Sequence, residues 1–185
     1  MQIYATLVEL TSKVGQPIGQ SEWTEISQAR IQQFADATDD HQWIHLDAER
    51  AQAGPFKTTI AHGFLTLSML PKLTATAYRV SDVGMGVNYG LNRVRFPSPV
   101  PAGGRIRASC KLLSAESIQG GSQITVEVTM ELEGAAKPVC IAEFVARLFV
   151  ASTHTPVLFF SSHGQVYKEH EIGFKLAMML PAFKG

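Results

Sequence analysis

Acidic and imidazole side chains are concentrated in one short stretch of the chain, residues 36–47. Within nine positions it holds Asp39, Asp40, His41, His45 and Asp47. The residues between them are partly apolar, which favours partial burial. A partly buried carboxylate beside an imidazole is stable only where each stabilises the other, and such a pair has pKa values suited to proton transfer. This stretch therefore predicts acid–base chemistry.

Two other interpretations fit the same residues. In one, the stretch is a solvated helix end, with Asp39 and Asp40 exposed and His45 a hydrogen-bonded core histidine. In the other, His41, His45 and the acids bind a metal. Among the remaining histidines and cysteines, His62 alone stands at a typical ligand spacing. We expect no bound metal.

A second candidate feature is the pair His62-Gly63, which begins a long apolar run. A helix that begins there has unpaired N–H groups and the positive end of its dipole at Gly63. Because glycine has no Cβ, a ligand oxygen can approach the backbone closely. The arrangement suits an oxyanion or a polarised thioester carbonyl. A tight turn would also explain the glycine.

Two helices and a short strand are expected to position these residues. Ser27 can cap a helix over residues 28–38. The run that begins at Gly63 is apolar on nearly all sides, which predicts an enclosed helix. Pro71 should kink this helix or begin a second helical segment. Residues 19–24 could form a short strand before the first helix.

The second half of the chain has the pattern of long strands. Apolar and polar residues alternate over residues 105–112 and 124–132, whereas residues 139–150 are mostly apolar at both parities, as in a central strand. In the strand over residues 87–96, a change of parity predicts a β-bulge near residues 92–93. We therefore expect an α+β fold, with an antiparallel sheet wrapped around the apolar helix.

The composition is that of an ordinary globular protein, with 45% apolar and 17% charged residues in a chain of 185. We expect one domain over residues 1–151 and a C-terminal extension of unknown role over 152–185, with a candidate helix over 168–180.

Sixteen basic residues balance sixteen acidic ones, which predicts no binding to nucleic acid or to a membrane surface. The sequence has no apparent signal peptide or membrane span. Cys110 and Cys140 are interpreted as small buried residues, which favours a cytoplasmic protein.

The combined motifs resemble one known family. Asp40-x-x-x-x-His45, the run IAHGFLTLSML and the stretch VNYGLNRVRFPSPVPAGGRIRA are similar to those of the MaoC-like hydratases. This family includes the (R)-specific enoyl-CoA hydratases and proteins similar to nodulation protein N. The resemblance extends from about residue 14 to residue 150. It implies the hot-dog fold, a curved antiparallel sheet around one long helix, and a homodimer with the substrate site between subunits.

The resemblance also implies a reaction, the reversible hydration of trans-2-enoyl-CoA to (R)-3-hydroxyacyl-CoA without a cofactor. Asp40 and His45 match the catalytic acid and histidine that hold and activate water. Gly63 matches the glycine whose backbone N–H holds the thioester oxygen. Gln42 and His62 would support these groups.

The substrate carrier would need partners for its phosphates. Candidate residues are Arg93 and Arg95, followed along the chain by Arg105 and Arg107. The same arginines also fit a solvated strand face. The expected partner is therefore an acyl-CoA thioester, with its phosphate contacts left open.

The sequence departs from the family pattern at three positions. Gln42 and Trp43 stand where Asn and Pro are common, and Pro71 replaces a serine of some members. Gln42 could still form a hydrogen bond across the turn, and Trp43 could narrow the acyl pocket. Two other functions stay open: hydrolysis of an acyl-CoA thioester, and non-catalytic binding of an acyl thioester.

Overall fold

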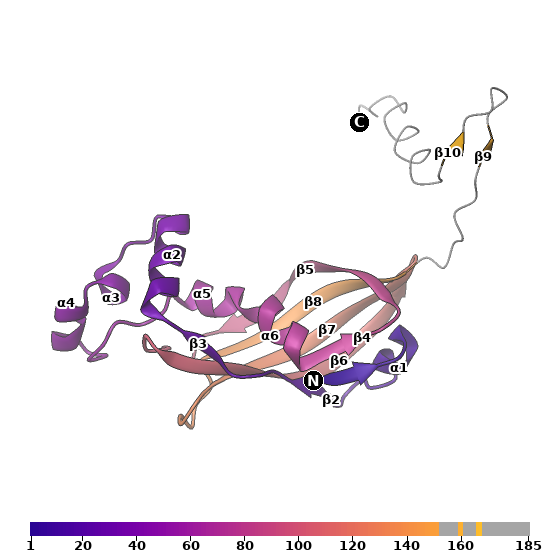
Figure 1. Cartoon of the computed structure of the whole chain (residues 1–185). Helices are drawn as coiled ribbons and strands as arrows, with labels where there is room; N and C mark the ends of the chain where they lie inside the picture. Colours follow the sequence, from indigo (N-terminus) through magenta and orange to yellow (C-terminus); the bar gives the residue numbers. More distant parts are fainter. Residues whose placement is uncertain (152–158, 161–165, 168–185) are drawn as a thin grey trace, which may run out of the picture. The chain divides into compact units, whose positions relative to one another are not determined.

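The computed structural model describes residues 1–151, 159–160 and 166–167. Residues 1–151 form one unit, which contains the long strands and the helices (Figure 1). In the second unit, β9 (Phe159–Phe160) pairs with β10 (Val166–Tyr167) in antiparallel orientation. The helix expected over residues 168–180 lies outside the described residues.

In residues 1–151, short N-terminal elements come first, a helical region follows, and four long strands come last. The strands are β1 (Gln2–Tyr4), β2 (Pro17–Gln20), β3 (Thr24–Ile26), β4 (Tyr78–Val80), β5 (Val83–Arg95), β6 (Gly104–Ile118), β7 (Gly121–Leu132) and β8 (Cys140–Val150). The helices are α1 (Leu7–Thr11), α2 (Gln28–Thr38), α3 (Trp43–Leu46), α4 (Ala48–Ala53), α5 (Gly63–Ser68) and α6 (Leu70–Ala77).

The long strands form an antiparallel sheet of order β2-β6-β7-β8-β5, with β3 also paired to β6. The expected strands are confirmed, and β8 is central, between β7 and β5. The predicted bulge is also confirmed, because the register of β5 on β8 shifts between Leu91 and Val94. The expected strand over residues 19–24 is divided. β2 ends at Gln20 and β3 begins at Thr24, and between them the Ser21 hydroxyl accepts a hydrogen bond from the Ala108 N–H.

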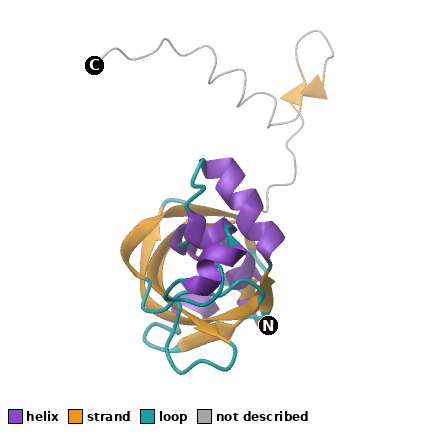
Figure 2. Ribbon diagram, turned by 90° about the vertical axis from the view of Figure 1, so that its left-hand side faces the viewer, coloured by secondary structure: helices purple, strands orange, loops and turns teal. Residues whose placement is uncertain are grey.

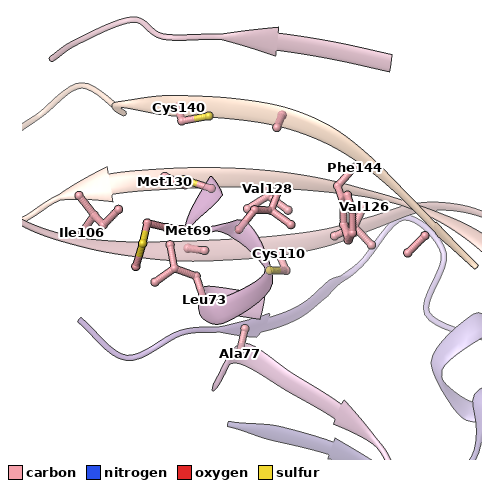
Figure 3. Close-up of a cluster of buried hydrophobic side chains, with 14 of the residues drawn as sticks. Met69, Leu73, Ala77, Ile106, Cys110, Val126, Val128, Met130, Cys140 and Phe144 are labelled. Carbon is pink, nitrogen blue, oxygen red and sulfur yellow. The ribbon is translucent and has the colours of Figure 1, made fainter. Parts of the chain in front are cut away.

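The apolar helical run lies inside the curve of the sheet (Figure 2), which confirms the α+β class. Pro71 stands in the first turn of α6 and divides the run into α5 and α6, as expected. Met69, Leu73 and Ala77 face the strands (Figure 3), where they pack in one core with Ile106, Val126, Val128, Met130 and Phe144. The core therefore joins the helix to β6, β7 and β8.

The expectation that this helix is enclosed on nearly all sides is wrong for a single chain. Phe64, in the first turn of α5, is 71% exposed. On β5, Met85, Tyr89 and Leu91 are exposed as well. The buried side of the helix faces the sheet, whereas Phe64 remains mostly exposed, with the Phe96 ring edge-on to it at 6.3 Å between centroids. Leu67 and Leu70 of the helices line one pocket with Leu91 of β5, so apolar side chains extend from α5 to the edge strand.

Both cysteines are buried, as expected, at 2% exposure for Cys110 and 0% for Cys140. Burial raises the pKa of the Cys110 thiol to about 12 and that of Cys140 to about 11. Both thiols are thus protonated and weakly nucleophilic near neutral pH. Among the described residues, no helix has the length and hydropathy to cross a bilayer.

Candidate active site

Three of the acids and histidines between α2 and α4 have structural roles of their own. Asp39 ends α2 with a left-handed backbone (φ 57°), a conformation that aspartate tolerates. His41 is exposed, and its Nε2 lies 3.0 Å from a carboxylate oxygen on the last turn of α2. The Asp47 carboxylate caps α4. Asp40 and His45 are the two that have no such role.

His45 is carried by α3 into the interior, where its side chain is 6% exposed. Its Nδ1 lies 2.7 Å from the Ile60 carbonyl oxygen. Because a carbonyl only accepts hydrogen bonds, Nδ1 carries the proton and Nε2 has the free lone pair. The His45 carbonyl accepts a hydrogen bond from Gln28 (2.8 Å), and Gln28 in turn accepts one from Thr59 (2.6 Å). The imidazole is thus held through both its ring and its backbone.

The environment favours the neutral form of His45. Burial lowers the pKa of His45 below its ordinary value of 6.5, and the neighbouring His62 lowers it further. The hydrogen bond to Ile60 and the charge of Asp40 act in the opposite direction and are outweighed. Nε2 is therefore available as a proton acceptor near pH 7.

Asp40 lies at the solvent side of this histidine. Its side chain is 54% exposed, and one carboxylate oxygen is 4.0 Å from Nε2 of His62. The polar side-chain atoms of Asp40, His45 and His62 lie within 4.8 Å of one another. The fold therefore brings the predicted acid and base, which are five residues apart along the chain, within reach of one small molecule. The other predicted supporting residue, Gln42, is exposed and its side chain does not cap α3.

The relative orientation of the two buried histidines suits proton transfer better than metal binding. The rings of His45 and His62 are stacked, with centroids 3.7 Å apart and planes inclined by 24°. Ring nitrogens bind a metal along lone pairs that lie in the ring plane, about 2.0–2.1 Å away for zinc. Two nearly parallel rings direct these lone pairs along separate planes, so they cannot converge on one ion. His41, a ligand in the metal interpretation, lies on the surface.

Gly63 borders the same site. A cavity of about 380 Å³ has mainly apolar walls and is lined by His45, Gly63, Thr66 and Phe96, among others. Gly63 is the first residue of α5, so its N–H has no partner within the helix. A Cβ at Gly63 would lie 3.1–3.3 Å from ring atoms of Phe96. His45 and the helix-initial Gly63 thus line one mainly apolar cavity.

Trp43, which departs from the family pattern, does not line this cavity. It packs against Gly54, and the guanidinium of Arg50 lies 4.4 Å from its ring centroid. The expectation that Trp43 narrows the pocket is therefore wrong for the described residues. Trp43 instead joins α3 to α4.

The four arginines considered for phosphate binding differ in their partners. Arg105 forms an ion pair with Glu133 (2.9 Å), and Arg107 pairs with Glu131 (2.7 Å). These two pairs match the interpretation as a solvated strand face. Arg93 and Arg95 are exposed near the end of β5 and form no ion pair with any described residue.

Curated relatives are similar over nearly the whole of their own length. The chain is 51% identical to 3-hydroxyacyl-thioester dehydratase Z of Mycobacterium tuberculosis over 148 residues, which cover 80% of this chain and 98% of the relative. It is 44% identical to nodulation protein N of Rhizobium leguminosarum over 144 residues, which cover 76% of this chain and 89% of that protein.

Solved structures share the fold. The unliganded R-hydratase PhaJ1 of Pseudomonas aeruginosa matches with a TM-score of 0.64 at 24% identity, over 80% of this chain and 88% of that one. The (R)-hydratase of A. caviae matches with a TM-score of 0.58 at 21% identity, over 70% and 95%. The family model described as "MaoC like domain" matches residues 9–136. The chain therefore belongs to the MaoC-like family of hydratases and dehydratases and has the hot-dog fold that its sequence predicts.

Proposed function

We propose that the protein catalyses the reversible hydration of a trans-2-enoyl thioester to an (R)-3-hydroxyacyl thioester, with Asp40 and His45 as the acid–base pair. One observation carries this proposal: the buried, neutral His45, whose Nε2 is free, has a ring nitrogen within 4.8 Å of an Asp40 carboxylate oxygen, and it lines a cavity together with the helix-initial Gly63. The relative named a 3-hydroxyacyl-thioester dehydratase supports the same reaction class.

In the proposed reaction, His45 Nε2 takes a proton from a water molecule that attacks C3. Its Nδ1–H keeps the bond to the Ile60 carbonyl and so supports the transient positive charge. Asp40 orients the water and relays the proton to C2. The water thus gives its hydroxyl to C3 and its proton to C2, and the pair returns to its starting state.

Two features accommodate the rest of the substrate. The cavity of about 380 Å³ has mainly apolar walls, which suits an acyl group. The Gly63 N–H would hold the oxygen of the enolate-like intermediate. Arg93 and Arg95 remain the candidates for the CoA phosphates, and Arg105 and Arg107 are the less suitable pair because glutamates already neutralise them.

The test is a direct assay of the purified protein with crotonyl-CoA and longer enoyl-CoAs, followed by the loss of the conjugated-enoyl absorbance. We expect hydration without release of free thiol. Release of thiol from acyl-CoA would replace the proposal with thioester hydrolysis. Tight binding of acyl-CoA without turnover would replace it with a non-catalytic binding role.

The substitution Gly63→Ala is expected to lower kcat/KM about tenfold. The new Cβ would displace the Phe96 ring and crowd the position proposed for the thioester oxygen. Initial rates with crotonyl-CoA measure the effect. Gly54→Ala is a control of similar crowding outside the cavity, since its Cβ would meet the Ala51 carbonyl oxygen and the Trp43 ring, each at 3.2 Å. Equal activity in the two variants would reduce Gly63 to an ordinary turn residue.

We also propose that the active form is a homodimer. The edge strand of the sheet, β5, exposes Met85 and Leu91, and Phe64 on α5 is 71% exposed. Proteins rarely leave such an edge uncovered. A second copy related by a two-fold axis would cover it and would shield the half-exposed Asp40.

Light scattering is expected to give twice the chain mass of 20.2 kDa. The interface between the two copies should bury about 1,600 Å² or more in total. Leu91→Glu should shift the mass towards that of one chain, because it buries a charge at the interface. Val8→Glu, a change at an exposed residue of α1, should not. A single-chain mass for active wild-type protein would contradict the dimer.

A further inference from the structure

His62 has a buried side chain although it stands just before the start of a helix. It immediately precedes α5, yet its side chain makes no capping hydrogen bond. The side chain is turned inward and is only 3% exposed. Its carbonyl accepts hydrogen bonds from the Thr66 N–H and hydroxyl, so the backbone alone serves the helix. The contacts of the imidazole in the protein interior must therefore account for its burial.

One contact of the His62 ring is with the main chain of Asp40. Its Nε2 lies 2.9 Å from the Asp40 carbonyl oxygen, across 22 residues of sequence. Because that oxygen can only accept, the proton of His62 is on Nε2. Nδ1 is buried and has no hydrogen-bond partner among the described residues. The ring is thus a hydrogen-bond donor with a fixed tautomer, and it ties the start of α5 to the loop that carries the acid.

The second contact is with the base. The His62 ring stacks on His45 at 3.7 Å between centroids, and the Phe34 ring lies 5.0 Å from it on a tilted plane. The hydrogen bond from His45 Nδ1 to Ile60 restrains the rotation of the base within its own plane, and the stacked ring fixes that plane. These restraints together set the direction of the reactive Nε2.

Stacking also affects the proton affinity of the base. The titratable groups that act on His45 are His62, which lowers its pKa, and Asp40, which raises it. Burial lowers the pKa most, and the His62 ring covers one face of His45. Removing that ring would admit water to the covered face of His45, and the loss of burial would raise the pKa of His45.

We infer that His62 is a positioning residue for the acid–base pair: its Nε2–H holds the main chain of Asp40, and its stacked ring holds the plane of His45. The inference deepens the proposed function and rests on it for its kinetic consequences, although the contacts exist without it. His62 touches neither water nor substrate in this scheme, and it acts only through the two reacting groups.

Two variants separate these roles. His62→Phe keeps a flat ring against His45 and loses the donor to Asp40, so we expect kcat to fall about tenfold to a hundredfold with KM changed little. His62→Gln keeps a donor near the position of Nε2 and loses the ring. In that variant the acid limb of kcat/KM should move to higher pH, towards the ordinary histidine pKa of about 6.5. His41→Gln, at the exposed histidine of the same region, is the matched control and should change neither.

NMR titration of the His45 ring tests the inference independently of turnover. Its midpoint should rise in His62→Gln relative to wild type and remain low in His62→Phe, and the Nε2–H tautomer of His62 should be visible in the wild-type protein. An unchanged midpoint in His62→Gln would overturn the stacking role, and an unchanged kcat in His62→Phe would overturn the hold on Asp40. A wild-type protein that does not hydrate enoyl thioesters would contradict the proposed function, and the titration would still decide the inference.

Discussion

Each of the substitutions His45→Gln and Asp40→Asn is expected to reduce enoyl-thioester hydration at least about a hundredfold, because positioned proton transfer contributes about a hundred- to ten-thousand-fold. Both changes remove proton-transfer capacity at little change in volume. The Gln side chain can still donate a hydrogen bond towards Ile60, so the local fold should persist. Initial rates at saturating and low substrate concentrations measure the loss.

The neighbouring acid provides a matched control for this prediction. Asp39→Asn changes the same functional group one residue earlier, and asparagine also tolerates the left-handed backbone at this position. Its activity should remain near that of wild type. Since Asp40 and His45 act on one water molecule, the double variant should be little worse than the poorer single variant. Near-normal turnover in either single variant would refute the acid–base assignment.

Leu73→Ala is expected to lower the free energy of unfolding by about 2–5 kcal/mol, the usual cost of removing a buried leucine side chain. Leu73 is 0% exposed on α6 and lies at the centre of the core that joins the helix to the strands. Denaturant unfolding at equal protein concentration measures the change, since assembly would affect apparent stability.

Val8→Ala is the control, because Val8 is 77% exposed on α1 and its truncation should cost less than about 0.5 kcal/mol. A loss below about 1 kcal/mol for Leu73→Ala would mean that the core rearranges to fill the space. It would contradict the tight packing of α6 against the sheet.

The long elements could be predicted because their periodicity reports burial directly. Ile106, Ala108 and Cys110 alternate with polar residues and are all buried on one face of β6. The short elements could not be predicted, since contacts distant in sequence stabilise them. The Leu7 N–H at the start of α1, for example, donates to the carboxylate of Asp82, 75 residues later. Such a contact leaves no periodic signal.

The site was predictable to a similar degree. The density of acids and histidines identified the stretch, and the resemblance selected Asp40 and His45 within it. Gln28 was missed, because it looks like any polar residue in the first turn of a helix, and its bond to the His45 carbonyl depends on how α2 meets α3. The stack of His62 on His45 was equally hidden, since it joins residues 17 positions apart through tertiary packing.

The cavity has two walls of different origin along the chain. One wall, with His45 and Gly63, comes from the helical region that precedes the long strands, and the residues that hold the acid–base pair come from the same region. The rest of the lining comes from the loop over residues 96–100 and from Val139, next to the first residue of β8. Under the proposed function, substitutions in this second segment can change which acyl group fits without altering Asp40 or His45. Acyl-group preference can then evolve while the proposed proton-transfer residues stay unchanged.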